Sequence, residues 1–274
     1  MNFLTWMFNE KDFKTHFSYL LKYTVIFAVL IILLAITTLN IGNKNPILLY
    51  ITLFMILIIA LCFLCFPLGY FWELTDKIIY RKTDIIASNI YDNKIKHVNL
   101  IEFPELNIWK FIWRGFASII ANIIMFIPYI SIIAIAITNS HDIESINLTT
   151  ITILNILFML FIPALLWNYA RKNSIVSTLN IFIAIDILGN STFKYLKTII
   201  LLSLVYFSNI IIDFFVSKIF VFFFGTSIQN LPLNIPTTFG IILLILYSLI
   251  KYYYLIFVNA YILGTMMPEK NNCI

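Results

Sequence analysis

Six apolar runs, each about as long as a helix that crosses a lipid bilayer, recur along the 274-residue chain. A helix needs about 20 apolar residues to cover about 30 Å of hydrocarbon. The runs are continuous rather than alternating, which excludes a transmembrane β-barrel. Only 11% of the residues are charged, against about 25% in soluble domains. The sequence therefore predicts an all-α integral membrane protein, a single domain over residues 1–274, with six transmembrane helices at about 23–39, 47–70, 116–138, 150–170, 196–217 and 237–263.

Two shorter segments have the pattern of amphipathic helices that lie at the membrane interface. The first, 9–22, starts with a capping Asn and places Phe and Leu at helical spacing. The second, 174–188, starts at a Ser and stops before Gly189, a residue type common at helix C-termini. The apolar stretch 219–224 follows a full-length span, so we expect either an overlong helix tip or a segment lying on the membrane surface.

Basic residues are distributed unequally between the two sides of these spans. Of the 18 Lys and Arg, fifteen lie in the N-terminal segment, the second and fourth connections and the tail, whereas the opposite side holds Lys44. Short positive loops stay in the cytoplasm, so we expect a multi-pass protein of the cytoplasmic (plasma) membrane with both termini inside. The net charge of +5 then predicts anionic lipid headgroups as partners of the cytoplasmic face. Nucleic acid is not expected, because no basic motif is interleaved with stacking aromatics.

One stretch carries a family resemblance. Residues 103–116 read FPELNIWKFIWRGF and precede an apolar span that contains FIPY at 126–129. They resemble the bacterial and archaeal membrane-protein family known as domain of unknown function 4013, whose members carry a Leu-Pro-Glu-Trp-like motif, a Phe, and a Gly that opens the next helix. Leu106 stands here in place of the Trp, and 83–102 looks like an insertion. The motif residues are Phe103, Pro104, Glu105, Trp109 and Gly115.

The resemblance extends to most of the chain. FPLGY at 66–70, with the basic pair Arg81 and Lys82, is similar to the family's Gly-Tyr and basic pair, and 180–197 fits its second-half loop. The resemblance implies a six-helix integral membrane protein and no established activity. A weaker likeness, to the membrane domains that accompany glycerophosphodiester phosphodiesterases, favours an accessory role by analogy alone.

The same motif has a physical interpretation. Pro104 and Glu105 are suited to the first turn of a helix, because Pro lacks an N–H and a carboxylate complements the helix dipole. Trp109 and a second Trp four residues later stand beside Lys110 and Arg114. This pattern predicts a helix in the headgroup region with anchored rings and outward-facing cations. The segment is then an elbow that leads into the third span, or alternatively a ligand or partner site.

Polar side chains recur at membrane depth in the last two spans. The cluster consists of Asn209, Asp213, Tyr247 and Lys251. Ionisable groups at this depth cost about 2.5–3.5 kcal/mol, so they turn toward partners or a wet cavity. We expect Lys251 to pair with Asp213 and to bond Asn209, as a polar clasp between antiparallel neighbours. The alternative is a substrate or ion path.

Three prolines are expected to bend helices. Pro67 lies near the inner end of the second span, and Pro128 and Pro163 fall near mid-bilayer in the third and fourth spans. Broken helices at the midplane of two inverted three-helix halves are a feature of transporters. Simple proline kinks are, however, common in membrane helices.

The parts of known catalytic sites are missing from the sequence. The three His lie in different segments, and there is no His-Glu-x-x-His, no paired intramembrane aspartate and no glycine-rich phosphate loop. We therefore predict no catalytic residues, no metal and no cofactor. The leading hypothesis is a non-enzymatic accessory or structural membrane component, and the alternative is a small-solute or lipid transporter component with a polar path between the fifth and sixth spans. No sequence motif indicates a particular protein partner.

The charge distribution makes a prediction about topology. A cysteine introduced at Ser145 should react with a membrane-impermeant maleimide only from outside the cell, and one at Asn93 only from inside. Labelling in the opposite sense would contradict the orientation.

Overall fold

The computed structural model describes residues 11–41, 45–92, 103–138, 148–224 and 235–266. Over these ranges the chain is helical and contains no strand, which confirms the all-α class. The helices are α2 (Lys11–Ile41), α3 (Pro46–Asp92), α4 (Ile108–Thr138), α5 (Leu148–Lys172), the short 3-10 helix η3 (Ile175–Leu179), α6 (Ile181–Phe224) and α7 (Ile235–Met266).

Five of these helices are long and apolar enough to cross a membrane. Their qualifying stretches are Asp12–Ile41, Pro46–Tyr80, Ile108–Ile127, Thr192–Phe220 and Leu243–Thr265. A multi-pass membrane protein is therefore confirmed, whereas the expected number of six spans is not. α5 covers the remaining expected span and is 25 residues long, but the side chains of its first half lie outside the described residues.

The two expected interfacial helices are not separate elements. Residues 11–22 form the beginning of α2, which continues to Ile41 without a break, while the expected cap Asn9 lies outside the described residues. Phe13 and Leu20 are buried in the protein core rather than facing lipid. No helix-breaking residue stands between the two parts, so the helix propagates once it has started.

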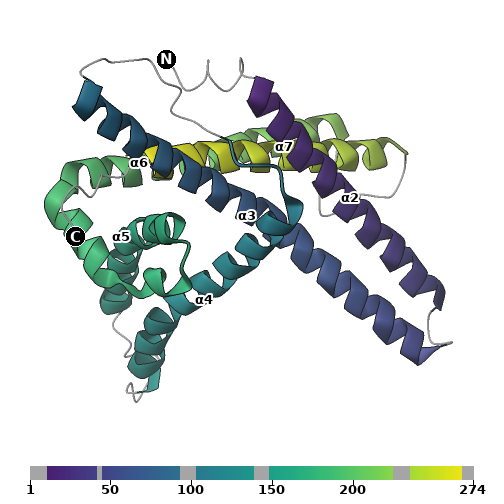
Figure 1. Cartoon of the computed structure of the whole chain (residues 1–274). Helices are drawn as coiled ribbons and strands as arrows, with labels where there is room; N and C mark the ends of the chain where they lie inside the picture. The colour runs from purple at the N-terminus through teal and green to yellow at the C-terminus, as the bar shows by residue number, and fades with distance from the viewer. Residues whose placement is uncertain (1–10, 42–44, 93–102, 139–147, 225–234, 267–274) are drawn as a thin grey trace.

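The second interfacial segment is divided differently from the prediction. Ser174 precedes η3, and α6 then runs from Ile181 through Gly189 to Phe224. A Gly costs a helix only about 1 kcal/mol, so Gly189 alone does not end α6. Residues 219–224 continue α6 to its last residue and are not a separate element. Figure 1 shows that α6 changes direction near its beginning.

α3 is the central element of the fold. It has 47 residues, about 70 Å of helix, and contacts α2, α4, α5 and α7. One face carries Phe66, Tyr70, Leu74 and Ile78 at helical spacing into a core shared with α2, α4 and α7. Trp72 belongs to a second core, shared with α4, α5, α6 and α7.

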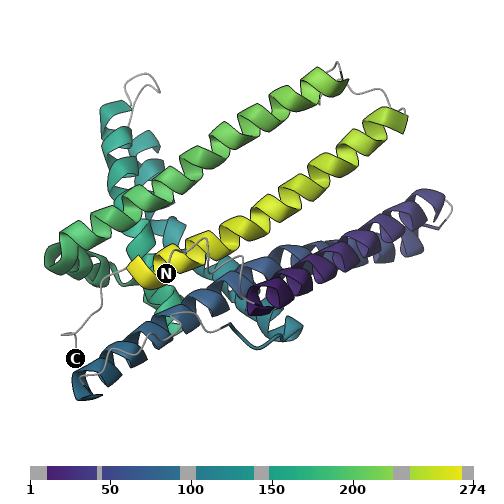
Figure 2. The ribbon, with the colours of Figure 1, turned by 90° about the horizontal axis from the view of Figure 1, so that it is seen from above.

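Both cores lie where the three hairpins come together, a region here called the core end. From it the hairpins α2–α3, α4–α5 and α6–α7 diverge, as Figures 1 and 2 show from two directions. The most apolar 18-residue windows of α3 and α6 are 0% buried inside the protein, and that of α2 is 6% buried. The parts of these helices that are best suited to hydrocarbon therefore do not cover one another.

Two glycines allow α3 and α4 to touch at their backbones. A Cβ placed on Gly69 would lie 1.7 Å from the carbonyl oxygen of Phe111, and one on Gly115 would lie 1.8 Å from that of Cys65. Such distances leave no space for a methyl group. Small residues are the usual device for close helix approach in membranes.

Substitution of these glycines tests the contact. Gly115→Ala should destabilise the protein by about 3 kcal/mol, because a methyl group that overlaps a backbone can be accommodated only by moving one helix away from the other. Gly189→Ala is the matched control, since its Cβ would meet nothing within 4 Å; it should be neutral or stabilise α6 by about 0.5–1 kcal/mol. Unfolding monitored by circular dichroism in detergent compares the two, and equal effects would contradict the close contact.

Candidate functional site

A buried ion cluster joins α3 to α4 at the core end. Glu73 and Asp76 lie three residues apart on α3, and Lys110 and Arg114 lie four residues apart on α4. These spacings place each pair on one helix face. The cluster holds two acids and two bases, so their charges balance within it. The close approach at Gly69 and Gly115 brings the two faces together.

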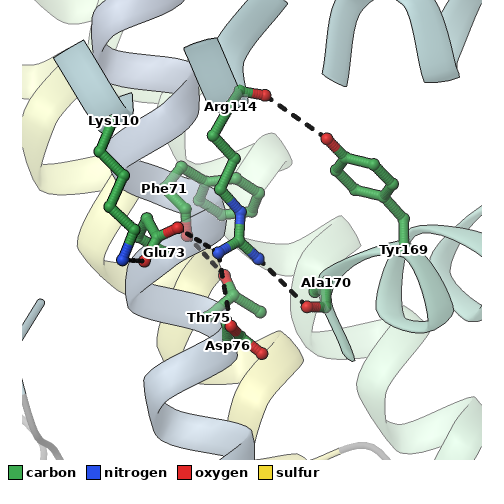
Figure 3. A network of polar contacts seen from close by, with 8 residues as sticks. All are labelled: Phe71, Glu73, Thr75, Asp76, Lys110, Arg114, Tyr169 and Ala170. Carbon is green, nitrogen blue, oxygen red and sulfur yellow. Dashed lines mark hydrogen bonds and ion pairs between the residues drawn. The ribbon is translucent and has the colours of Figure 1, made fainter. Parts of the chain in front are cut away.

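Arg114 is the centre of the cluster (Figure 3). Its Nη1 donates to Glu73 Oε1 and lies 3.3 Å from Asp76 Oδ2. Lys110 Nζ lies 2.9 Å from Glu73 Oε2. The side chains of Arg114 and Glu73 are 5% and 4% exposed, whereas that of Lys110 is 50% exposed. Arg114 and Glu73 are therefore the desolvated pair, and Lys110 stands at its rim.

The guanidinium group also connects α4 to α5. Arg114 Nη2 donates to the carbonyl oxygen of Ala170 over 3.2 Å, and the Tyr169 hydroxyl donates to the carbonyl oxygen of Arg114 over 3.4 Å. Ala170 stands in the last turn of α5, which ends at Lys172, where carbonyls have no partner within the helix. A cation at this end also complements the helix dipole. Arg114 thus caps α5 while it neutralises two acids on α3.

Two polar atoms in the cluster remain without a hydrogen-bond partner among the described residues. They are Asp76 Oδ1 and Arg114 Nε, and both are buried. Breaking a buried pair by removing one partner costs far more than the pair contributes, because a charge is left uncompensated. The ion cluster therefore stabilises one particular packing of α3, α4 and α5.

This cluster corrects two predictions for the motif segment. Arg114 faces inward to α3, not outward, because the acids of α3 lie where α4 crosses it. The helix begins at Ile108 instead of at Pro104 and Glu105. Asn107 is the reason, since its Oδ1 accepts from the Lys110 amide over 3.2 Å, and Asn is among the best N-cap residues.

The motif residues do not converge on one site. Phe103 stacks on His16 with ring centroids 4.6 Å apart, Pro104 is buried, and Glu105 is exposed. Trp109 is 75% exposed, while Gly115 lies against α3. The segment leads into α4 and contacts α2 and α3, and the choice between an elbow and a ligand or partner site stays a prediction.

A second charged pair joins α6 to α7. Lys251 Nζ lies 2.5 Å from both carboxylate oxygens of Asp213, and the Tyr247 hydroxyl donates to Asp213 Oδ1 over 3.2 Å. The Lys251 and Asp213 side chains are 22% and 51% exposed. Asn209 does not take part, because its amide donates to the carbonyl of Val205 over 2.7 Å on its own helix.

Asn209 instead lines a cavity of about 330 Å³, here called the α6–α7 cavity. The lining also includes Tyr206 on α6 and Asn259 on α7, Phe71 on α3 and Pro163 on α5. Asn209 lies one helical turn from Asp213 along α6. The cavity lining does not include Asp213 or Lys251.

The three prolines lie inside helices and end none of them. Pro67 is within α3 and Pro163 within α5. Pro128 falls within α4, although its side chain lies outside the described residues. Within the helical ranges that the structure covers, no group of three His, Cys, Asp or Glu is placed to hold a metal ion.

No protein-family model, no curated protein and no solved structure matches this chain. The resemblance of residues 103–116 to domain of unknown function 4013 therefore stays a prediction.

The ion cluster was not predicted, although the sequence holds a signal for it. Two acids stand just past the apolar part of α3, and two bases stand just before the apolar part of α4. Opposite charges on the same side of consecutive spans are candidates for pairing.

Substitutions separate the buried member of the cluster from its rim. Arg114→Met should destabilise the protein by about 3–5 kcal/mol, because Glu73 and Asp76 lose their shared buried cation. The control Lys110→Met should cost at most about 1 kcal/mol, since that side chain is half exposed. Thermal unfolding in detergent measures both. A loss from Lys110→Met as large as that from Arg114→Met would contradict the central place of Arg114.

Proposed function

We propose that this protein is a non-enzymatic accessory or structural component of the cytoplasmic membrane, with six transmembrane helices and both termini in the cytoplasm. The supporting observation is that the three hairpins diverge from the core end, where the ion cluster holds α3, α4 and α5 together. Their apolar faces are exposed, as at Phe54, Leu57 and Phe207. Such faces in a membrane contact lipid or the helices of other proteins.

In this proposal the core end lies on the cytoplasmic side of the membrane. The positive-inside rule puts the basic connections there, and the ion cluster stands next to them on α3 and α4. Trp113, like Trp109, is about three-quarters exposed, which suits rings anchored at headgroup level beside anionic lipid. The core end would then be a rigid base from which the hairpins enter the bilayer.

A transporter component is the second candidate, and the α6–α7 cavity favours it. Asn209, Tyr206 and Asn259 give its lining hydrogen-bonding groups at a depth where polar groups mark substrate paths. The Asp213–Lys251 pair lies next to it along the same two helices. In this alternative the pair opens to admit a small solute or lipid.

A double-mutant cycle with a transport assay separates the two candidates. For Lys251→Met and Asp213→Leu we expect a coupling of about 0.5–2 kcal/mol, because each single change leaves a poorly solvated charge. An accessory or structural role predicts that the double variant restores stability and keeps its partners in affinity capture from native membranes.

The transport alternative predicts the opposite pattern. Lys251→Met would then abolish solute or lipid flux in proteoliposomes while stability stays close to that of the native chain. Leu204→Met, at an exposed apolar position of α6, is the control for both readouts. Additive effects of the two charge substitutions would contradict the clasp.

A further inference from the structure

An open depression lies on the segment that connects α5 to α6, here called the η3 depression. It has a volume of about 470 Å³. The polar side chains that line it include those of Lys172, Ser174 and Asn180, and the apolar ones are those of Val176, Leu179 and Phe182. None of the lining residues is acidic. The depression therefore combines a cation and hydrogen-bonding groups with apolar side chains.

The turn that forms the depression is fixed to the core end. α5 ends at Lys172, and Asn173 follows with a positive φ of 48°, a conformation that Asn tolerates directly after a helix. The Asn168 amide then donates to the carbonyl oxygen of Ser177 over 2.7 Å, and both side chains are buried. Ile175 packs against the second core. Because of these contacts, η3 presents the same side chains outward at all times.

Three polar side chains around the depression have no partner within the part of the chain that the structure describes. They are the Lys172 ammonium, the Ser174 hydroxyl and the Asn180 amide. Lys172 and Asn180 are exposed, and Ser174 is half-buried. Each of these groups can donate a hydrogen bond to an oxygen of an anion. The polar lining is thus suited to an anionic group.

The apolar side chains restrict where such a surface can lie. Val176 is 73% exposed and Phe182 is 83% exposed, which is unfavourable in water. The ammonium of Lys172 and the amide of Asn180 are equally unfavourable in hydrocarbon. The apolar stretch of α6 that is suited to the bilayer begins only at Thr192. A mixed surface just before that stretch fits the boundary between headgroups and acyl chains.

The charge of the segment identifies the occupant. Residues 171–185 contain two cations and no acid. The Arg171 guanidinium lies 5.6 Å from the centroid of the Trp167 ring, so Lys172 is the cation that the depression offers to a ligand. A soluble anion would satisfy the polar groups and leave Val176 and Phe182 exposed. An anionic phospholipid satisfies both, because it carries a phosphate next to glycerol and acyl chains.

We propose that the η3 depression binds one anionic phospholipid. Lys172, Ser174 and Asn180 hold its phosphate, and the apolar side chains of the depression contact its glycerol and the first part of its acyl chains. The bound lipid holds the turn between α5 and α6 at the membrane surface. The proposal rests on the cytoplasmic placement of the core end in the proposed function. It goes beyond the general attraction of basic connections to lipid, because it assigns one headgroup to one site.

Lipid titration of the full-length chain in detergent, followed by native mass spectrometry, tests the site. Phosphatidylglycerol should bind at least about fivefold more tightly than phosphatidylcholine, and Lys172→Gln should remove that difference, as expected for one cation at an anionic headgroup. Lys14→Gln removes the same charge from an exposed position of α2 and is the matched control, which should keep the difference. Equal losses in the two variants, or no loss in Lys172→Gln, would overturn the proposal.

Photo-crosslinking separates this proposal from the membrane placement on which it rests. In vesicles of equal phosphatidylglycerol and phosphatidylcholine, p-benzoylphenylalanine in place of Phe182 should give phosphatidylglycerol adducts about threefold in excess. The same crosslinker in place of Leu204, an exposed apolar residue of α6, should give both adducts equally. Lipid adducts at 204 with none at 182, or with no excess there, would overturn the headgroup site alone. Absence of lipid adducts at both positions would contradict the membrane placement itself.

Discussion

The arrangement of the helices depends on the buried guanidinium group of Arg114. It joins the acids of α3 to the exposed carbonyl end of α5, and it stands one residue from Gly115, where α4 touches α3. The ion pairing of Arg114 and the close helix contact at the glycines depend on each other. Without the glycines the charges would stay too far apart to pair, and without the pairing the close approach would bury uncompensated charge. The contact fixes where α4 crosses α3. The hydrogen bond from Arg114 to the end of α5 then determines where α5 packs.

The ion cluster joins α3, α4 and α5 near the core end, whereas farther out the Asp213–Lys251 pair joins only the two helices of one hairpin, α6 and α7. Aromatic residues such as Tyr70 and Phe111 fill the core around α3, and beyond them the hairpins diverge and leave their apolar windows uncovered. The α6–α7 cavity, which is lined from α3, α5, α6 and α7, is a consequence of that divergence. This candidate binding region therefore results from where the helices pack against one another, and no sequence motif specifies it.

Some of the polar contacts could be predicted from particular residues of the sequence. Asp213 and Lys251 were expected to meet because each is an ionisable group in an apolar helix, and the structure brings them together. Asn209 was expected to join them, but a carbonyl one turn away on its own helix satisfies its amide. Arg114 was expected to face the headgroups because Trp109 and Trp113 stand beside it. A helix, however, directs neighbouring residues to different faces, and only the crossing of α3 and α4 shows which face is buried.

The sequence by itself determined the class of protein and its helices, since long apolar runs in a chain with few charges have no other stable form than helices in a bilayer. It also placed the charged residues on the last two helices. The predicted helix ends differ from those of the structure, because α2 and α6 extend through segments that have the local pattern of separate interfacial helices. Tertiary structure alone decided which charges pair across α3 and α4, and which faces remain open. Those choices depend on the distance between backbones at Gly69 and Gly115, and such a distance is set by packing between helices rather than by the pattern along any one of them.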